Sequence, residues 1–144
     1  MSPAVYVLNG PNLNLLGTRE PEIYGYDTLA DIEANVRAQA AALGLGIEFR
    51  QSNHEGVLVD WLHEARAKGA KAVLLNAGAY THTSIAILDA IKAIGVPVIE
   101  VHLSDPEKRE TFRHHSYVGM GAVDVVKGLG ADGYLVALER AAKL

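Results

Sequence analysis

The chain has 144 residues, of which 49% are hydrophobic and 21% charged, and its formal net charge is −4. This balance excludes a disordered or collagen-like chain and fits one globular domain spanning 1–144. An acidic excess without a basic cluster argues against nucleic-acid binding through phosphate neutralisation, and the lack of cysteine excludes disulfides, thiolate nucleophiles and sulfur-ligated metals.

Two segments bear on location. The N-terminus lacks a charged leader followed by an apolar stretch, so no export signal is visible. The longest uncharged stretch, 72–88, is interrupted by polar side chains from Asn76 to Ser84 and does not resemble a membrane span. We therefore expect a soluble, cytoplasmic protein without a membrane partner.

The first half of the chain alternates strand and helix patterns. The apolar run 4–8 ends at the turn formers of 9–12, which predicts a strand. Apolar residues at helical spacing predict a helix over 29–43, with Thr28 as N-cap and Gly44 just after its end. Alternation over 46–51 predicts a second strand, and 56–68 a second helix.

The second half continues the alternation. The runs 72–75, 96–101 and 123–126 predict strands. Three helices are predicted around these strands. The first ends before Gly95, the second is a short polar helix from Pro106 to about residue 115, and the third is a closing helix over 134–143. The apolar positions of the first of these helices are Ile85, Leu88, Ile91 and Ala93.

Strands alternating with helices along the whole length indicate an α/β fold with a parallel sheet covered on both faces. Five strands in this length fit a flavodoxin-like, doubly wound sheet with three α/β/α layers. Ligands of such sheets bind beyond the carboxyl ends of the strands. The segments to inspect are therefore 9–14, 51–55, 76–84, 100–105 and the neighbourhood of Lys127.

Polar residues follow the first strand. The asparagines of 9–14 are either turn formers or neutral donors to a ligand oxygen. Next comes 18–26, a polar stretch without periodicity that is typical of a functional lid. Within it, Arg19 and Tyr24 suggest a phenolate base, because a nearby guanidinium favours the ionised form of a tyrosine whose free pKa is about 10. The competing interpretation is a surface Arg19 paired with Glu20 or Glu22.

The third and fourth strands also end in polar residues. Asn76 and His82 offer polar groups among small residues, although Thr83 or Ser84 could simply cap the next helix. Glu100 and His102 are two apart and so face the same side, where a carboxylate raises the pKa of the imidazole and fixes its tautomer. This pair is either a general acid or a structural pair at the sheet rim.

The segment after the fourth strand has two features. Ser104 or Asp105, just before Pro106, marks the start of the polar helix, and Ser104 and Glu107 have the spacing of a capping box. Arg109 and Arg113 are four apart and so predicted to share one face. Either arginine could clamp a substrate, but Glu107 and Glu110 could also neutralise both.

Several motifs are absent or out of context. The sequence 128–133 spells GxGxxG, but it lies near the C-terminus with no second βαβ half and no acidic residue about 20 positions on. No HExxH pair occurs, and adjacent His114 and His115 have a poor spacing for metal ligands. Neither a GxSxG elbow nor a GxxxxGK[ST] loop is present.

Taken together, these motifs resemble the type II 3-dehydroquinate dehydratases over nearly the whole chain and in order. The matching segments are 9–17 (NGPNLNLLG), 19–21 with 24–25 (REP, YG), 51–53 (QSN), 76–84 (NAGAYTHTS), 100–102 (EVH) and 112–116 (FRHHS). The chain departs from the family pattern at 119–121 (GMG) and at Asp105, where asparagine is commoner.

The resemblance implies loss of water from 3-dehydroquinate to give 3-dehydroshikimate, in aromatic biosynthesis or quinate breakdown, by anti elimination through an enolate. It implies no metal, no cofactor and no Schiff base. Tyr24 would remove the proton alpha to the ketone, assisted by Arg19, and Asn12 would help hold the enolate oxygen through a water. His102, oriented by Glu100, would protonate the departing hydroxyl.

The resemblance also implies how the substrate is held. Its carboxylate would contact Asn76 and the backbone of Leu103 and Ser104. The residues that would contact the ring hydroxyls or shape the pocket are His82, Asp89 and Arg113. The family further implies a homododecamer. The alternative is a noncatalytic flavodoxin-like binding or signalling module, although 9–14 has neither the acidic residues of a receiver nor the phosphate loop of a flavin binder.

Overall fold

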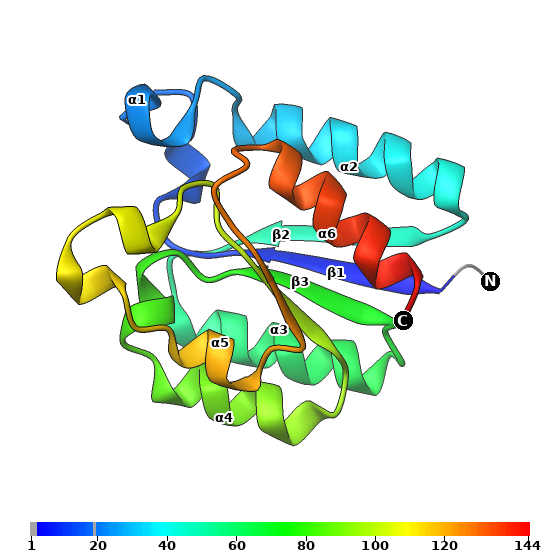
Figure 1. Ribbon diagram of the computed structural model, residues 1–144. Helices are drawn as coiled ribbons and strands as arrows, with labels where there is room; N and C mark the ends of the chain where they lie inside the picture. The colour runs from blue at the N-terminus through cyan, green and yellow to red at the C-terminus, as the bar shows by residue number, and fades with distance from the viewer. Residues whose placement is uncertain (1–2, 19) are drawn as a thin grey trace.

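The computed structural model describes residues 3–18 and 20–144, which form a five-stranded parallel sheet in the order β2-β1-β3-β4-β5. Helices cover both of its faces, so the predicted three-layer, flavodoxin-like class is confirmed (Figure 1). The strands are β1 (Ala4–Asn9), β2 (Gly46–Gln51), β3 (Ala72–Asn76), β4 (Val98–Val101) and β5 (Asp124–Val126). The α-helices are α1 (Pro21–Tyr24), α2 (Leu29–Leu43), α3 (Glu55–Ala67), α4 (Ile85–Ile94), α5 (Tyr117–Gly121) and α6 (Asp132–Ala142).

Strand alternation divides the core into two. Val5 and Val7 of β1 face α2 and α6, whereas Tyr6 and Leu8 face α3, α4 and α5 (Figure 1). The strand next to β1 on one side is β2 and on the other β3, so the chain winds outward in both directions. The carboxyl ends of β1 and β3 border the switch point where ligands of such sheets bind.

The ends of α2 follow the predicted chemistry. The Thr28 hydroxyl accepts from the backbone N–H of Asp31 at 3.1 Å, and the Asp31 carboxylate accepts from the backbone N–H of Thr28 at 3.0 Å. Gly44 has a left-handed φ of 71°, which closes the helix without a Cβ clash. Both predictions for this helix are confirmed.

The predicted polar helix from Pro106 to about residue 115 is wrong. Two separate 3-10 turns, Pro106–Lys108 and Thr111–Arg113, occupy this segment. Its one large apolar side chain, Phe112, is 68% exposed, so a continuous helix would have no apolar face to bury. Of the two predicted start residues, Asp105 is the cap, because its carboxylate accepts from the backbone N–H of Glu107. The capping box from Ser104 is wrong.

Two other predictions need correction. Ile85 and Ala93 are exposed on α4, where the buried face is formed by Ile87, Leu88, Ala90, Ile91 and Ile94. The segment predicted to be an irregular lid contains the one-turn helix α1, which carries Tyr24 at its last residue. The short helix α5 was not predicted, because five residues give too little periodicity to recognise.

Candidate active site

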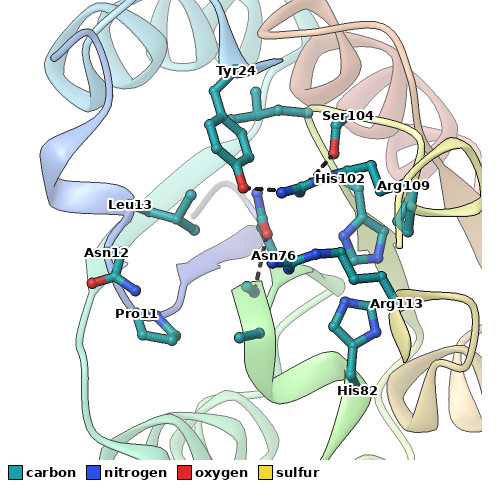
Figure 2. A pocket seen from close by; sticks show the side chains of 14 residues that line it. Pro11, Asn12, Leu13, Tyr24, Asn76, His82, His102, Ser104, Arg109 and Arg113 are labelled. Atoms are coloured by element: carbon teal, nitrogen blue, oxygen red, sulfur yellow. Dashed lines mark hydrogen bonds between the residues drawn. The ribbon is translucent and has the colours of Figure 1, made fainter. Parts of the chain in front are cut away.

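A small cavity, partly open to solvent, lies beyond the carboxyl ends of β1, β3 and β4. Four segments line it: the loop after β1, the end of α1, the turn after β3, and the stretch that follows β4 (Figure 2). The position predicted from the doubly wound sheet is therefore occupied by a real cavity.

An imidazole and a carboxylate form a buried pair on the β4 side of the cavity. The Nε2 of His102 lies 2.5 Å from Oε2 of Glu100, and both side chains are nearly inaccessible to solvent. Because a carboxylate oxygen accepts, Nε2 donates, and the other ring nitrogen of His102 is the one left for the cavity that this ring lines. The predicted proximity of Glu100 and His102 is confirmed.

Two hydroxyls support the same carboxylate oxygen. Thr81 Oγ1 and Ser116 Oγ lie 2.8 Å and 2.5 Å from Glu100 Oε2. Burial alone raises the pKa of a carboxyl group, but the hydrogen bond and charge of His102, together with these hydroxyls, outweigh burial and lower the pKa of Glu100. Glu100 is therefore ionised at neutral pH and holds a permanent negative charge behind the His102 ring.

Tyr24 enters the cavity from α1, where it meets a guanidinium. Arg109 Nη1 donates to the Tyr24 hydroxyl oxygen at 2.9 Å, and the guanidinium carbon lies 5.2 Å from the centre of the Tyr24 ring. Figure 2 shows this contact together with the one from Arg109 to Ser104. A cation at this distance stabilises negative charge on the phenol oxygen. The predicted partner of Tyr24, Arg19, lies outside the described residues.

His82 contributes a neutral ring. Its Nδ1 lies 2.8 Å from the His115 carbonyl oxygen, which can only accept, so Nδ1 carries the proton and Nε2 has the free lone pair. Burial lowers the pKa of His82, although the bond to His115 acts in the opposite direction. Above that lowered pKa, His82 can accept a hydrogen bond from a ligand hydroxyl.

Three donors lie close together at the ends of β3 and β4. Asn76 Oδ1 accepts from the backbone N–H of Gly78 at 3.2 Å, so its amide nitrogen serves as donor. Within the described part of the chain, the backbone N–H groups of Leu103 and Ser104 have no acceptor, although both residues line the cavity. Unpaired amide donors in a cavity favour an anionic ligand such as a carboxylate.

The loop that spells GxGxxG supports these donors. The backbone N–H of Gly128 donates to the carbonyl of Ser104 at 3.1 Å, and that of Gly130 to the carbonyl of Leu103 at 2.9 Å. Both glycines have positive φ, which an L side chain rarely adopts. The glycines thus fix the backbone that follows β4.

Of the remaining predicted residues, Asn12 and Arg113 line the cavity and Asp89 does not. Asn12 lines the cavity with a left-handed φ of 69°, a conformation that asparagine tolerates better than most residues. Arg113 lines the cavity while its Nε donates to Glu110 at 3.0 Å. Asp89 is exposed on α4 and does not line the cavity of its own chain.

Sequence reasoning left three contributors out of the predicted site. Arg109 was weighed as a clamp, but nothing in the sequence ties it to Tyr24, 85 residues away. Thr81 and Ser116 were not singled out, since hydroxyl residues near helix starts are usually caps, and Ser116 does also cap α5. The signal for Thr81 is its location in the turn that follows β3.

Residues 3–18 and 20–144 contain neither a candidate metal site nor a candidate membrane span. No group of three or more His, Asp or Glu side chains there is arranged to hold a metal ion. None of the helices in these ranges is long and apolar enough to cross a membrane.

Taken together, the fold and the cavity define a doubly wound α/β enzyme in which a carboxylate-backed imidazole and a tyrosine line one site. The chain belongs to the class II dehydroquinase family, whose model matches residues 3–142. The noncatalytic alternative is not favoured.

Individual relatives agree with this family. A 3-dehydroquinate dehydratase from Phenylobacterium zucineum is 59% identical over 144 residues, which is 100% of this chain and 99% of that protein. 3-Dehydroquinate dehydratase 2 from Agrobacterium fabrum is 62% identical over 132 residues, covering 92% and 89%. The crystal structure of a type II dehydroquinase from Propionibacterium acnes superposes with a TM-score of 0.95 at 42% identity, covering 100% and 99%.

Proposed function

We propose that this chain removes water from 3-dehydroquinate to give 3-dehydroshikimate, a step of the shikimate pathway or of quinate breakdown, by anti elimination through an enolate. The observation that carries the proposal is one cavity lined by Tyr24 and by the Glu100-backed His102. A carbon acid needs a base, and a hydroxide-like leaving group needs an acid.

Tyr24 is the proposed base. As a phenolate it takes the proton from the carbon alpha to the ketone, and the electron pair of that C–H bond forms the enolate. Arg109 donates to the phenolate oxygen at 2.9 Å and so stabilises its charge. Arg19 is proposed to add a second guanidinium, and Asn12 to hold the enolate oxygen through a water.

His102 is the proposed acid. As the enolate collapses, its electrons form the ring double bond and the C–O bond breaks. The protonated His102 ring gives its proton to the departing oxygen, which leaves as water. Glu100 stabilises the imidazolium before this step and keeps the ring oriented after it. Each turnover leaves Tyr24 protonated and His102 neutral, and exchange with solvent restores both.

The substrate is held by donors and acceptors that suit its groups. The amide of Asn76 and the backbone N–H groups of Leu103 and Ser104 bind its carboxylate. His82 and Arg113 bind ring hydroxyls. Asp89 is assigned the same role, but it is exposed on α4, so it would have to reach the cavity of a neighbouring protomer.

The proposed assembly is therefore a homo-oligomer, a dodecamer by the family resemblance, in the cytoplasm and without a nucleic-acid partner. Side chains available for contacts between protomers include Ile85, Met120 and Val123, each more than half exposed. Analytical ultracentrifugation of the purified chain measures the number of protomers directly.

To test this function, 3-dehydroquinate is added to the purified protein, and the absorbance of the product's conjugated enone is measured. Tyr24→Phe is expected to lower kcat by about 10³-fold and to abolish exchange of the alpha proton in deuterated water. Tyr26→Phe is the matched control, because Tyr26 lies two residues away and is 80% exposed.

His102→Ala separates the two proton transfers. This variant is expected to lose dehydration while it keeps measurable exchange of the alpha proton. Near-parental turnover of Tyr24→Phe would remove Tyr24 as the base. Equal loss of exchange and dehydration in His102→Ala would contradict the assignment of the acid.

A further inference from the structure

A buried tyrosine on α6 connects two asparagines at the carboxyl ends of β1 and β3. The hydroxyl of Tyr134 donates to Asn9 Oδ1 at 2.6 Å and accepts from Asn76 Nδ2 at 3.0 Å. Tyr134 and Asn9 are fully buried, and Asn76 is 3% exposed. Of the three, Asn76 alone lines the cavity.

Backbone groups at the two ends fix the direction of every bond in this chain. The Arg50 carbonyl can only accept, so Asn9 turns its Nδ2 to it, at 3.0 Å, and its Oδ1 to Tyr134. The Gly78 N–H can only donate, so Asn76 turns its Oδ1 to it, at 3.2 Å, and its Nδ2 to Tyr134. The single hydroxyl proton of Tyr134 then goes to Asn9, and its oxygen accepts from Asn76.

This direction determines what Asn76 presents to a ligand. One N–H of its Nδ2 is used by Tyr134, and the second remains for the cavity. If the amide were turned by 180°, its nitrogen would face the Gly78 N–H, and donor would oppose donor. Burial raises the pKa of the Tyr134 phenol well above its usual value, so the hydroxyl stays protonated and the pattern persists at alkaline pH.

We infer that Tyr134 is a positioning residue, which together with Asn9 locks the Asn76 amide so that an N–H, rather than a carbonyl oxygen, faces the substrate's carboxylate. The inference rests on the proposed role of Asn76. It extends the site to two residues that do not contact the substrate. Tyr134 is one hydrogen bond away from Asn76, and Asn9 is two. The inference also gives a functional reason for the buried polar groups at positions 9 and 134.

The test is Tyr134→Phe, which keeps the ring and removes only the hydroxyl. The KM for 3-dehydroquinate is expected to rise by about fivefold to tenfold, while kcat changes by no more than about twofold, because the lost order weakens binding rather than the chemical step. A purely structural role would lower the folded fraction, and therefore the apparent kcat, without changing KM.

Tyr6→Phe is the matched control. Tyr6 is also a buried tyrosine with a hydrogen-bonded hydroxyl, but its partner is Glu64, away from the cavity. Its KM is expected to equal that of the parent. If Tyr6→Phe raises KM as much as Tyr134→Phe, the effect is general to the core and the inference is wrong.

A double-mutant cycle tests the connection itself. Asn76→Ala is expected to raise KM by more than Tyr134→Phe, and Tyr134→Phe introduced into Asn76→Ala is expected to add nothing. If the fold-increases in KM of the two single variants multiply in the double variant, the inference is overturned, because Tyr134 would then act independently of Asn76. A parental KM in Asn76→Ala would overturn both the inference and the proposed role of Asn76. A raised KM in Asn76→Ala with a parental KM in Tyr134→Phe would overturn the inference alone.

Asn9→Ser provides a second way to break the chain of hydrogen bonds if Tyr134→Phe yields too little folded protein. The shorter side chain no longer reaches the Tyr134 hydroxyl, so the direction of its proton is no longer fixed. The KM is expected to rise by about twofold to fivefold. A KM equal to that of the parent would contradict the inference.

Discussion

In each of two glutamates, Glu64 and Glu100, one carboxylate oxygen accepts several hydrogen bonds, but the two clusters have different consequences. Glu64 Oε2 on α3 accepts from the Tyr6 hydroxyl and from Arg50, each at 2.7 Å. Glu100 Oε2 on β4 accepts from His102 and is held by two neighbouring hydroxyls. Both carboxyl groups have lowered pKa values, which for Glu64 is about 2 because Arg50 and Tyr6 donate to it.

The difference lies in the partner and in what that partner touches. Arg50 is always charged, and its guanidinium lies over the rings of Tyr6 and Trp61, so the Glu64 cluster is a permanent clamp between β2 and α3. His102 is an imidazole, which can take up and release a proton, and its ring lines a cavity. The same carboxylate arrangement thus stabilises the fold in one region and supports the proposed acid in the other.

The largest effect is expected from breaking the Glu100 cluster. Glu100→Gln removes the negative charge behind His102, so the imidazolium loses its stabilisation and kcat is expected to fall by about 10² to 10³-fold. Glu64→Gln is the matched control, with kcat expected within about twofold of the parent, because its cluster does not border the cavity. Steady-state assays of both variants decide the matter. Comparable kcat losses in the two variants would contradict a functional difference between the clusters.

A smaller effect is expected from the hydroxyls around Glu100. Thr81→Val and Ser116→Ala each remove a hydroxyl that lowers the pKa of Glu100, so Glu100 becomes protonated at a higher pH as the solution is acidified. The acid limb of the kcat/KM profile is therefore expected to move to higher pH.

The control for this series is Thr81→Ser, which keeps the hydroxyl and is expected to show the parental pH profile. His82 and Lys127 also lie within electrostatic range of Glu100 and are unchanged in all three variants. An acid limb that stays at the parental pH in both Thr81→Val and Ser116→Ala would show that the hydroxyls do not tune the carboxylate.

The surroundings of Glu100 could largely be predicted from the sequence. Local rules were sufficient for the strand–helix alternation, for the caps of α2, and for the proximity of Glu100 and His102, which are two residues apart. The edge of the sheet where ligands bind followed from the parallel order of the strands.

The contacts that could not be predicted join residues far apart in the sequence. Arg109 meets Tyr24 because two 3-10 turns, rather than one helix, bring its side chain over α1. Tyr134 reaches Asn9 across 125 positions only because α6 packs against the central strands. The helix predicted over 134–143 begins at Tyr134, but this prediction does not say which polar group the hydroxyl will meet.

The smallest effect concerns stability rather than turnover and belongs to the Glu64 cluster. Because folding lowers the pKa of Glu64 from 4.5 to about 2, its ionised form contributes stability that is complete above about pH 5 and is lost as the pH falls toward 2. Its side chain is 35% exposed, so solvent screening limits this contribution to about 1 kcal/mol. Urea unfolding of the parent and Glu64→Gln is expected to show that difference at pH 7 and a smaller one at pH 3. A difference that persists unchanged at pH 3 would mean that Glu64 acts through packing, and that its charge has no part in the clamp.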